Sequence, residues 1–155
     1  MKRLILAAAT ALCLAPTAHA QQPVDSDTAY DYFLEYKACI DFASLSMKPK
    51  LKRFRDRTHD YADMTQHLMK RADYYERYLT VAQHRAWSKK ISPLDFSEKM
   101  EQEQLERALE NTTEGTDTLA LALRGNPQAT TEMRKAMTQR AYECHYLAYE
   151  VEHPE

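Results

Sequence analysis

The chain has 155 residues and a formal net charge of −2, with 44% hydrophobic and 28% charged residues. This length suits one domain with one core, and the slightly acidic balance excludes the strong positive charge typical of nucleic-acid binding. Only two glycines occur, and the sequence contains no glycine-rich phosphate loop, Gly-x-Ser-x-Gly or His-Glu-x-x-His motif. The composition favours an all-α protein, and the absence of these catalytic motifs favours a protein that is not an enzyme.

The first twenty residues have the layout of a secretory signal peptide. Met1-Lys2-Arg3 is a positive start, residues 4–14 are almost entirely apolar, and Ala18-His19-Ala20 is a small-x-small cleavage site. The apolar run is too short for a transmembrane helix, which needs about 20 residues. We expect residues 1–20 to be cleaved, leaving a single helical domain over residues 21–155 in the bacterial periplasm.

Cleavage would remove Cys13 and leave Cys39 and Cys144. An even number of cysteines in an oxidising compartment favours a disulfide. Two buried free thiols are the alternative. A bond closing so long a loop would stabilise the fold by about 4–5 kcal/mol in the chain-entropy model.

The first helix is predicted over residues 26–47, with Asp25, Ser26 and Asp27 supplying capping oxygens and negative charge at its start. Apolar residues recur at spacings of three and four, which places them on one face. This stripe comprises Ala29, Tyr32, Phe33, Tyr36, Cys39, Ile40, Ala43 and Met47.

The second helix is predicted to begin near Pro49 and to continue to about Lys90, a length of roughly 60 Å. No glycine or proline interrupts this stretch after its start. A heptad seam runs along it. The seam comprises Leu51, Phe54, Thr58, Tyr61, Thr65, Leu68, Ala72, Tyr75, Leu79, Ala82 and Ala86.

A third helix is predicted to start at Ser92, with Asp95 in the reciprocal capping position and a possible break at residues 111–115. Its seam comprises Leu105, Leu109, Thr112, Thr116, Leu119 and Leu123. Gly125-Asn126-Pro127 indicates a stop followed by a last helix over residues 127–151. The inner stripe of that helix comprises Met133, Met137, Ala141, Cys144, Ala148 and Val151.

Four helices joined by short connections predict an all-α, four-helix up-down bundle with long central helices. The first and last helices are neighbours in this topology. Cys39 and Cys144 lie on the inner stripes of those two helices. The sequence therefore predicts a disulfide that links the first helix to the last.

The segment 48–57 is strongly basic and includes Arg53, Arg55 and Arg57. It could bind an anionic partner such as phospholipid, lipopolysaccharide, peptidoglycan carboxylates or an acidic protein. The alternative is charge pairing with the acidic third helix, which would set the register of the bundle. That helix carries Asp95, Glu98, Glu101, Glu103, Glu106, Glu110, Glu114 and Asp117.

Histidine, aspartate and methionine recur along the second predicted helix. Asp60, Asp63 and His67 share one face, as do Met64 and His67, and such a set could hold copper or zinc. The heptad places His59, His67 and His84 outside the seam, however, and a closed zinc site needs about four convergent ligands. We expect no metal site and no cofactor.

A helical bundle could also bind haem as a cofactor. Covalent attachment is excluded because the chain lacks Cys-x-x-Cys-His. The best axial candidates are Met47, Met137 and His145, and these residues suit ordinary core packing equally well.

Tyrosine is abundant, and Tyr142, Tyr146 and Tyr149 are spaced along one face of the last helix. They suit either packing at the edge of the bundle or a partner-binding surface, where tyrosine is enriched. Together with Arg53, Arg55 and Arg57 they are the candidate partner-binding residues.

These observations predict a non-enzymatic, exported binding protein of the bacterial envelope: an inhibitor, immunity protein, chaperone or assembly adaptor. Its partner would be another envelope protein or an anionic envelope component, and not a nucleic acid. A metal- or haem-binding helical bundle is the alternative function.

Overall fold

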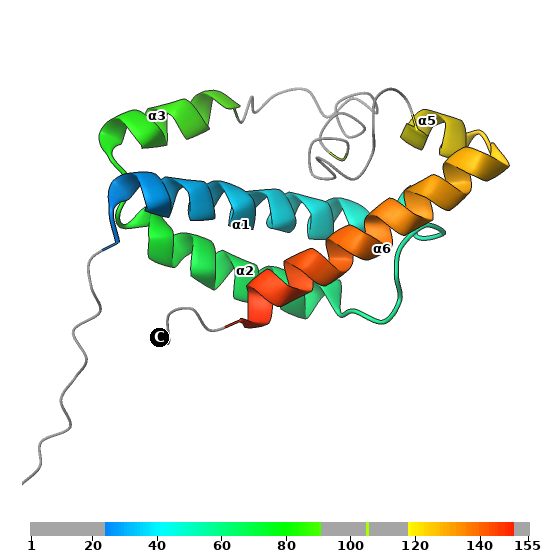
Figure 1. The fold of residues 1–155 in the computed structure, drawn as a ribbon, viewed down its shortest axis with the longest axis horizontal. Helices are drawn as coiled ribbons and strands as arrows, with labels where there is room; N and C mark the ends of the chain where they lie inside the picture. The colour runs from blue at the N-terminus through cyan, green and yellow to red at the C-terminus, as the bar shows by residue number, and fades with distance from the viewer. Residues whose placement is uncertain (1–23, 91–104, 106–117, 151–155) are drawn as a thin grey trace, which may run out of the picture.

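The computed structural model describes residues 24–90, 105 and 118–150, and every regular element in this part of the chain is a helix (Figure 1). The elements are α1 (Ser26–Ser46), the short 3₁₀ helix η1 (Pro49–Leu51), α2 (Tyr61–Glu76), α3 (Val81–Lys90), α5 (Thr118–Leu123) and α6 (Pro127–Tyr149). The prediction of an all-α fold is confirmed. None of the described helices is long and apolar enough to cross a membrane.

Helices α1 and α2 lie side by side and run in opposite directions, and α6 runs obliquely across them (Figure 1). α6 contacts α5 and α2 more extensively than it contacts α1. α3 joins the core through Trp87, whose ring packs edge-on against Phe33 at 5.3 Å between centroids. The core therefore lies where α1, α2 and α6 meet.

Helix α1 matches its predicted bounds to within one residue. Asp25 caps it by accepting hydrogen bonds from the Thr28 backbone N–H at 2.9 Å and the Thr28 hydroxyl at 2.6 Å. The predicted stripe is buried at Ala29, Phe33, Tyr36, Cys39 and Ala43. Tyr32 and Ile40 are partly buried. Met47 departs from the stripe, because it follows the last turn and is 42% exposed.

The prediction of one helix over residues 49–90 is wrong. Asp56 accepts hydrogen bonds from the N–H and hydroxyl of Thr58, at 2.8 and 2.7 Å, and holds a local turn. Asp60 then caps α2 by accepting from the N–H groups of Ala62 and Asp63. These side chains offer the backbone local partners that compete with helical hydrogen bonds, so the helix is interrupted without glycine or proline.

A second interruption separates α2 from α3. Thr80 and Gln83 form a capping box: the Thr80 N–H donates to Gln83 Oε1 at 2.8 Å, and the Gln83 N–H donates to Thr80 Oγ1 at 3.2 Å. Ala82 and Ala86 are exposed, so the predicted seam does not extend into α3.

The predicted stop at Gly125 is confirmed. Gly125 has a φ of +88°, and its N–H donates to the Ala122 carbonyl while the Asn126 N–H donates to the Leu121 carbonyl. Asn126 then accepts from the Ala129 N–H at 3.0 Å and caps α6. Helices α5 and α6 are thus joined by a tight turn whose backbone groups form hydrogen bonds with nearby residues.

The predicted inner stripe of α6 is confirmed at Met133, Met137, Ala141, Cys144 and Ala148, all of which are buried. Val151, the predicted leader and most of the predicted third helix lie outside the described residues. Leu105 and Leu119 of the third seam are buried. The four-helix up-down arrangement stays a prediction.

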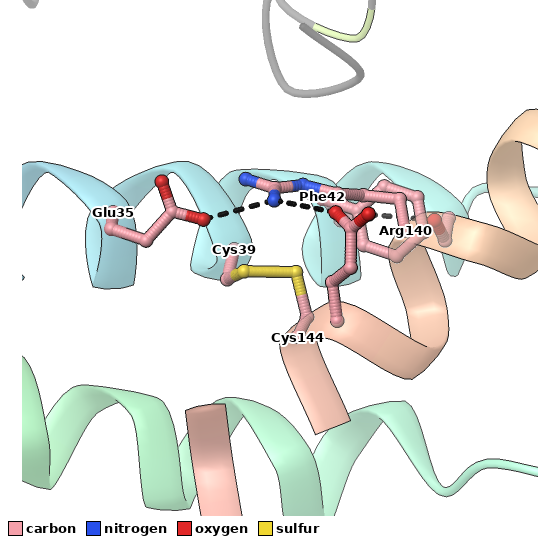
Figure 2. The surroundings of a disulfide bond; sticks show 7 residues. Glu35, Cys39, Phe42, Arg140 and Cys144 are labelled. Atoms are coloured by element: carbon pink, nitrogen blue, oxygen red, sulfur yellow. Dashed lines mark hydrogen bonds and ion pairs between the residues drawn. A yellow bond between two sulfur atoms is a disulfide. The ribbon is translucent and has the colours of Figure 1, made fainter. Parts of the chain in front are cut away.

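The disulfide between Cys39 and Cys144 is confirmed, with a Cα–Cα distance of 5.4 Å and a sequence separation of 105. Both cysteines are fully buried. Next to the bond, the Arg140 guanidinium on α6 pairs with Glu35 of α1 at 2.9 Å and with Glu143 at 3.0 Å (Figure 2). A covalent bond and an ion pair therefore fix α6 on α1 at the same place.

Replacing both Cys39 and Cys144 by alanine should lower the free energy of unfolding by about 4 kcal/mol, because the unfolded chain regains the entropy of a long open loop. Urea unfolding of the oxidised protein and of this double variant measures the difference. Reduction of the parent protein is the matched control for lost packing, and equal stability of all three forms would contradict the role given to the bond.

Candidate functional site

The outer side of α6 carries large exposed aromatic residues opposite its buried stripe. Tyr142 is 57% exposed, Tyr146 is 59% exposed and Tyr149 is 38% exposed. Their spacing of four and three residues places them along one side of the helix. The structure therefore brings the three candidate tyrosines together on the surface.

Histidines from the segment before α2, from α2 and from α6 complete this surface. The His59 ring meets the ring of Tyr142 edge-on at 4.8 Å and lies 4.8 Å from the ring of His145. Tyr149 in turn lies 4.6 Å from His145 and 4.7 Å from His67 of α2. We call this continuous surface the histidine–tyrosine face; it comprises His59, His67, Tyr142, His145, Tyr146 and Tyr149.

Polar contacts anchor the end of this face that lies against α2. The Tyr149 hydroxyl donates to the Asp63 carboxylate, and His67 Nδ1 donates to the Asp63 carbonyl oxygen at 3.0 Å. The hydrogen bond to Asp63 raises the pKa of Tyr149 to about 12. Tyr149 therefore stays a neutral hydrogen-bond donor throughout the physiological pH range.

His59 is the most constrained residue of the face. Its Nε2 atom is buried and has no hydrogen-bond partner among the described residues. Burial lowers the pKa of His59 below its ordinary 6.5, the nearby His145 lowers it further, and Asp56 opposes both effects. The neutral imidazole is therefore the form that this surface accommodates at neutral pH.

Stability should fall as the pH drops below about 6.5, because the unfolded chain then binds a proton at His59 more tightly than the folded chain does. The stabilisation is complete above the unfolded pKa and declines towards the lower folded pKa. Urea unfolding at pH 8 and pH 5 should show a smaller loss for His59→Gln than for the parent. His84→Gln, on α3 and outside the face, is the control; a loss unchanged in His59→Gln would contradict the assignment.

The three candidate arginines do not join this face as a group, and they lie on the irregular segment 52–60 rather than on a helix. The Arg55 guanidinium lies 5.5 Å from the centre of the Tyr61 ring. The Arg53 guanidinium lies 4.7 Å from the centre of the Phe54 ring and donates to the Leu123 carbonyl at 2.9 Å. Arg53 and exposed Arg57 instead line a separate hollow.

Sequence reasoning missed the meeting of His59 with His145. The spacing of Tyr142, His145, Tyr146 and Tyr149 places His145 on the same side of α6 as the tyrosines. No local signal could place His59 there, because it lies on a segment whose path depends on tertiary contacts.

The metal and haem candidates do not converge. Among the residues that the structure describes, no group of three or more His, Cys, Asp or Glu side chains could hold a metal ion. Met64 lies fully buried in the core, away from the exposed side of α2 that carries Asp63. Of the haem candidates, Met137 is buried whereas Met47 and His145 are exposed.

Comparison with known proteins gives no relative: no family model, curated protein or solved structure matches the chain.

Proposed function

We propose that this chain is a non-enzymatic binding protein of the bacterial envelope, exported to the periplasm by its leader, that holds a partner protein on the histidine–tyrosine face. The observation that carries the proposal is the exposure of Tyr142 and Tyr146, at 57% and 59%, on a helix whose opposite side is buried and disulfide-bonded. An inhibitor, an immunity protein, a chaperone and an assembly adaptor would all use such a surface.

Tyrosine suits this role for physical reasons. Its ring brings a large apolar area, its hydroxyl makes hydrogen bonds, and few rotatable bonds are frozen when it binds. Residues 142–149 extend over about 10 Å of helix, which favours an extended protein contact over a small molecule. None of the described helices covers the exposed sides of these tyrosines.

The fixed position of α6 supports the proposal further. Binding is weakened by the entropy of ordering the groups that make the contact. The disulfide at Cys144 and the ion pair of Arg140 with Glu35 lie on the same helix as the tyrosines. The surface is therefore ordered before any partner arrives.

A partner captured from envelope extract by immobilised oxidised protein should bind Tyr142→Ala and Tyr146→Ala more weakly by about 2 kcal/mol or more, because central aromatic anchors carry most of the binding energy. Mass spectrometry identifies the partner and titration calorimetry measures the affinity. Met69→Ala, which removes a side chain that is 50% exposed on α2, is the matched control.

Circular dichroism must show that each variant keeps its helical content. If both folded tyrosine variants bind the purified partner as tightly as the parent and the Met69→Ala control, the histidine–tyrosine face is not the binding surface.

A metal-binding bundle is the second candidate function, favoured by one observation: the His59 and His145 rings lie 4.8 Å apart. Two imidazoles are fewer than the roughly four ligands of a closed zinc site, so we place this function second. A haem site has no comparable supporting contact among the described residues.

Copper and zinc should bind the oxidised protein only weakly, and the His59→Ala/His145→Ala double variant should change that affinity little. Calorimetric titration with each metal and a visible absorption spectrum of the purified protein provide the measurement. Submicromolar affinity that disappears in the double variant would place metal binding ahead of protein recognition.

A further inference from the structure

A basic hollow lies where η1 and the segment after it meet the end of α5. The hollow has a volume of about 430 Å³ and is lined by Pro49, Lys50, Lys52, Arg53, Arg57 and Leu123. Four of these side chains are cationic, and none of these described lining residues is acidic. A concave surface lined by charges of one sign concentrates counter-ions more strongly than isolated surface charges do.

Arg53 is held in place before any ligand binds. One of its terminal nitrogens donates to the Leu123 carbonyl at 2.9 Å, and its guanidinium lies over the ring of buried Phe54. Its backbone carbonyl accepts from Arg134 Nε at 3.3 Å. A guanidinium has five N–H donors, so the bond to Leu123 leaves this group able to contact an anion as well.

We propose that the basic hollow binds the phosphate group of a phosphate ester. Arginine matches phosphate oxygens in a planar, two-point geometry, while lysine contributes a mobile point charge. A single carboxylate needs one such arginine, whereas Lys52, Arg53 and Arg57 around one hollow match an anion with several oxygens and more than one negative charge. Pro49 and Leu123 add an apolar edge that suits the organic part of an ester.

The proposal does not depend on the histidine–tyrosine face, because none of the residues that line the hollow belongs to that face. The same phosphate chemistry occurs in lipid headgroups and in soluble esters. Arg53 is a poor residue to replace first, because it also satisfies the carbonyl at the end of α5. Lys52 and Arg57 are exposed and can be replaced with less effect on the fold.

Calorimetry with pyrophosphate should show binding to oxidised protein that weakens about tenfold or more in Lys52→Gln/Arg57→Gln, the ratio expected when hydrogen bonds to charged groups are lost. Lys70→Gln/Arg77→Gln removes the same charge from exposed positions outside the hollow and should change the affinity less than about twofold, as expected for a remote, screened charge. Acetate should bind far more weakly than pyrophosphate.

Co-sedimentation with vesicles of equal parts phosphatidic acid and phosphatidylcholine, against phosphatidylcholine alone, distinguishes the two sources of phosphate. Retention on the phosphatidic acid vesicles that the hollow variant loses supports a lipid headgroup. Binding of pyrophosphate without vesicle retention supports a soluble phosphate compound as the source of the phosphate group. Absence of both, equal losses in the two double variants, or acetate binding as tight as pyrophosphate binding would overturn the proposal.

Discussion

The disulfide between Cys39 and Cys144 gives the contact between α1 and α6 a stabilisation that the packing around it does not supply. α1 lies along α2, whereas α6 crosses the pair and meets α1 over a short stretch beside the disulfide (Figures 1 and 2). A short crossing buries little apolar area, and hydrophobic stabilisation scales with the area buried. The covalent link compensates by lowering the entropy of the unfolded chain. This crossing positions the outer residues of α6 relative to α1 together with the contacts that α6 makes with α2 and α5.

Arg140 stabilises the same crossing by a different interaction. Its side chain is only 9% exposed, whereas its partners Glu35 and Glu143 are 44% and 42% exposed. The aliphatic part of an arginine can cover apolar surface while its charged end reaches an acid at the edge. This arrangement avoids the large desolvation cost of burying both charges. The ion pair also favours one orientation of α6 relative to α1, whereas a disulfide alone would restrict that orientation less.

The parts of the fold that follow from local signals could be predicted from the sequence. Asp25, Gly125 and Pro127 set helix ends through their own geometry, and the buried stripe of α6 follows from spacing alone. The interruptions of the predicted helix over residues 49–90 also have local signals, the caps at Asp60 and Thr80, but an apparent heptad seam that spans both caps predicts one helix. Alanine and threonine fit a heptad seam without requiring burial, as exposed Thr58, Ala82 and Ala86 show.

The candidate site also combines features that could be predicted from the sequence with contacts that could not. Exposure of the α6 tyrosines agrees with their helical spacing, which depends only on residues close in sequence. The contact of His59 with His145 joins an irregular segment to a helix, and no periodicity within either segment encodes it. The same holds for Arg53, whose bond to Leu123 depends on how η1 meets α5. Contacts between distant segments therefore had to come from the three-dimensional structure.

Because the disulfide is buried, the rate at which it is reduced reports a motion of the folded protein. Both cysteines have no exposed surface, and thiol–disulfide exchange requires a thiolate to reach one of the two sulfur atoms. An added reductant can therefore react with the bond only when α6 separates from α1. Hydrogen exchange detects local openings of the same kind. The time course of reduction under native conditions then reports how often this crossing opens, with no label attached to the protein.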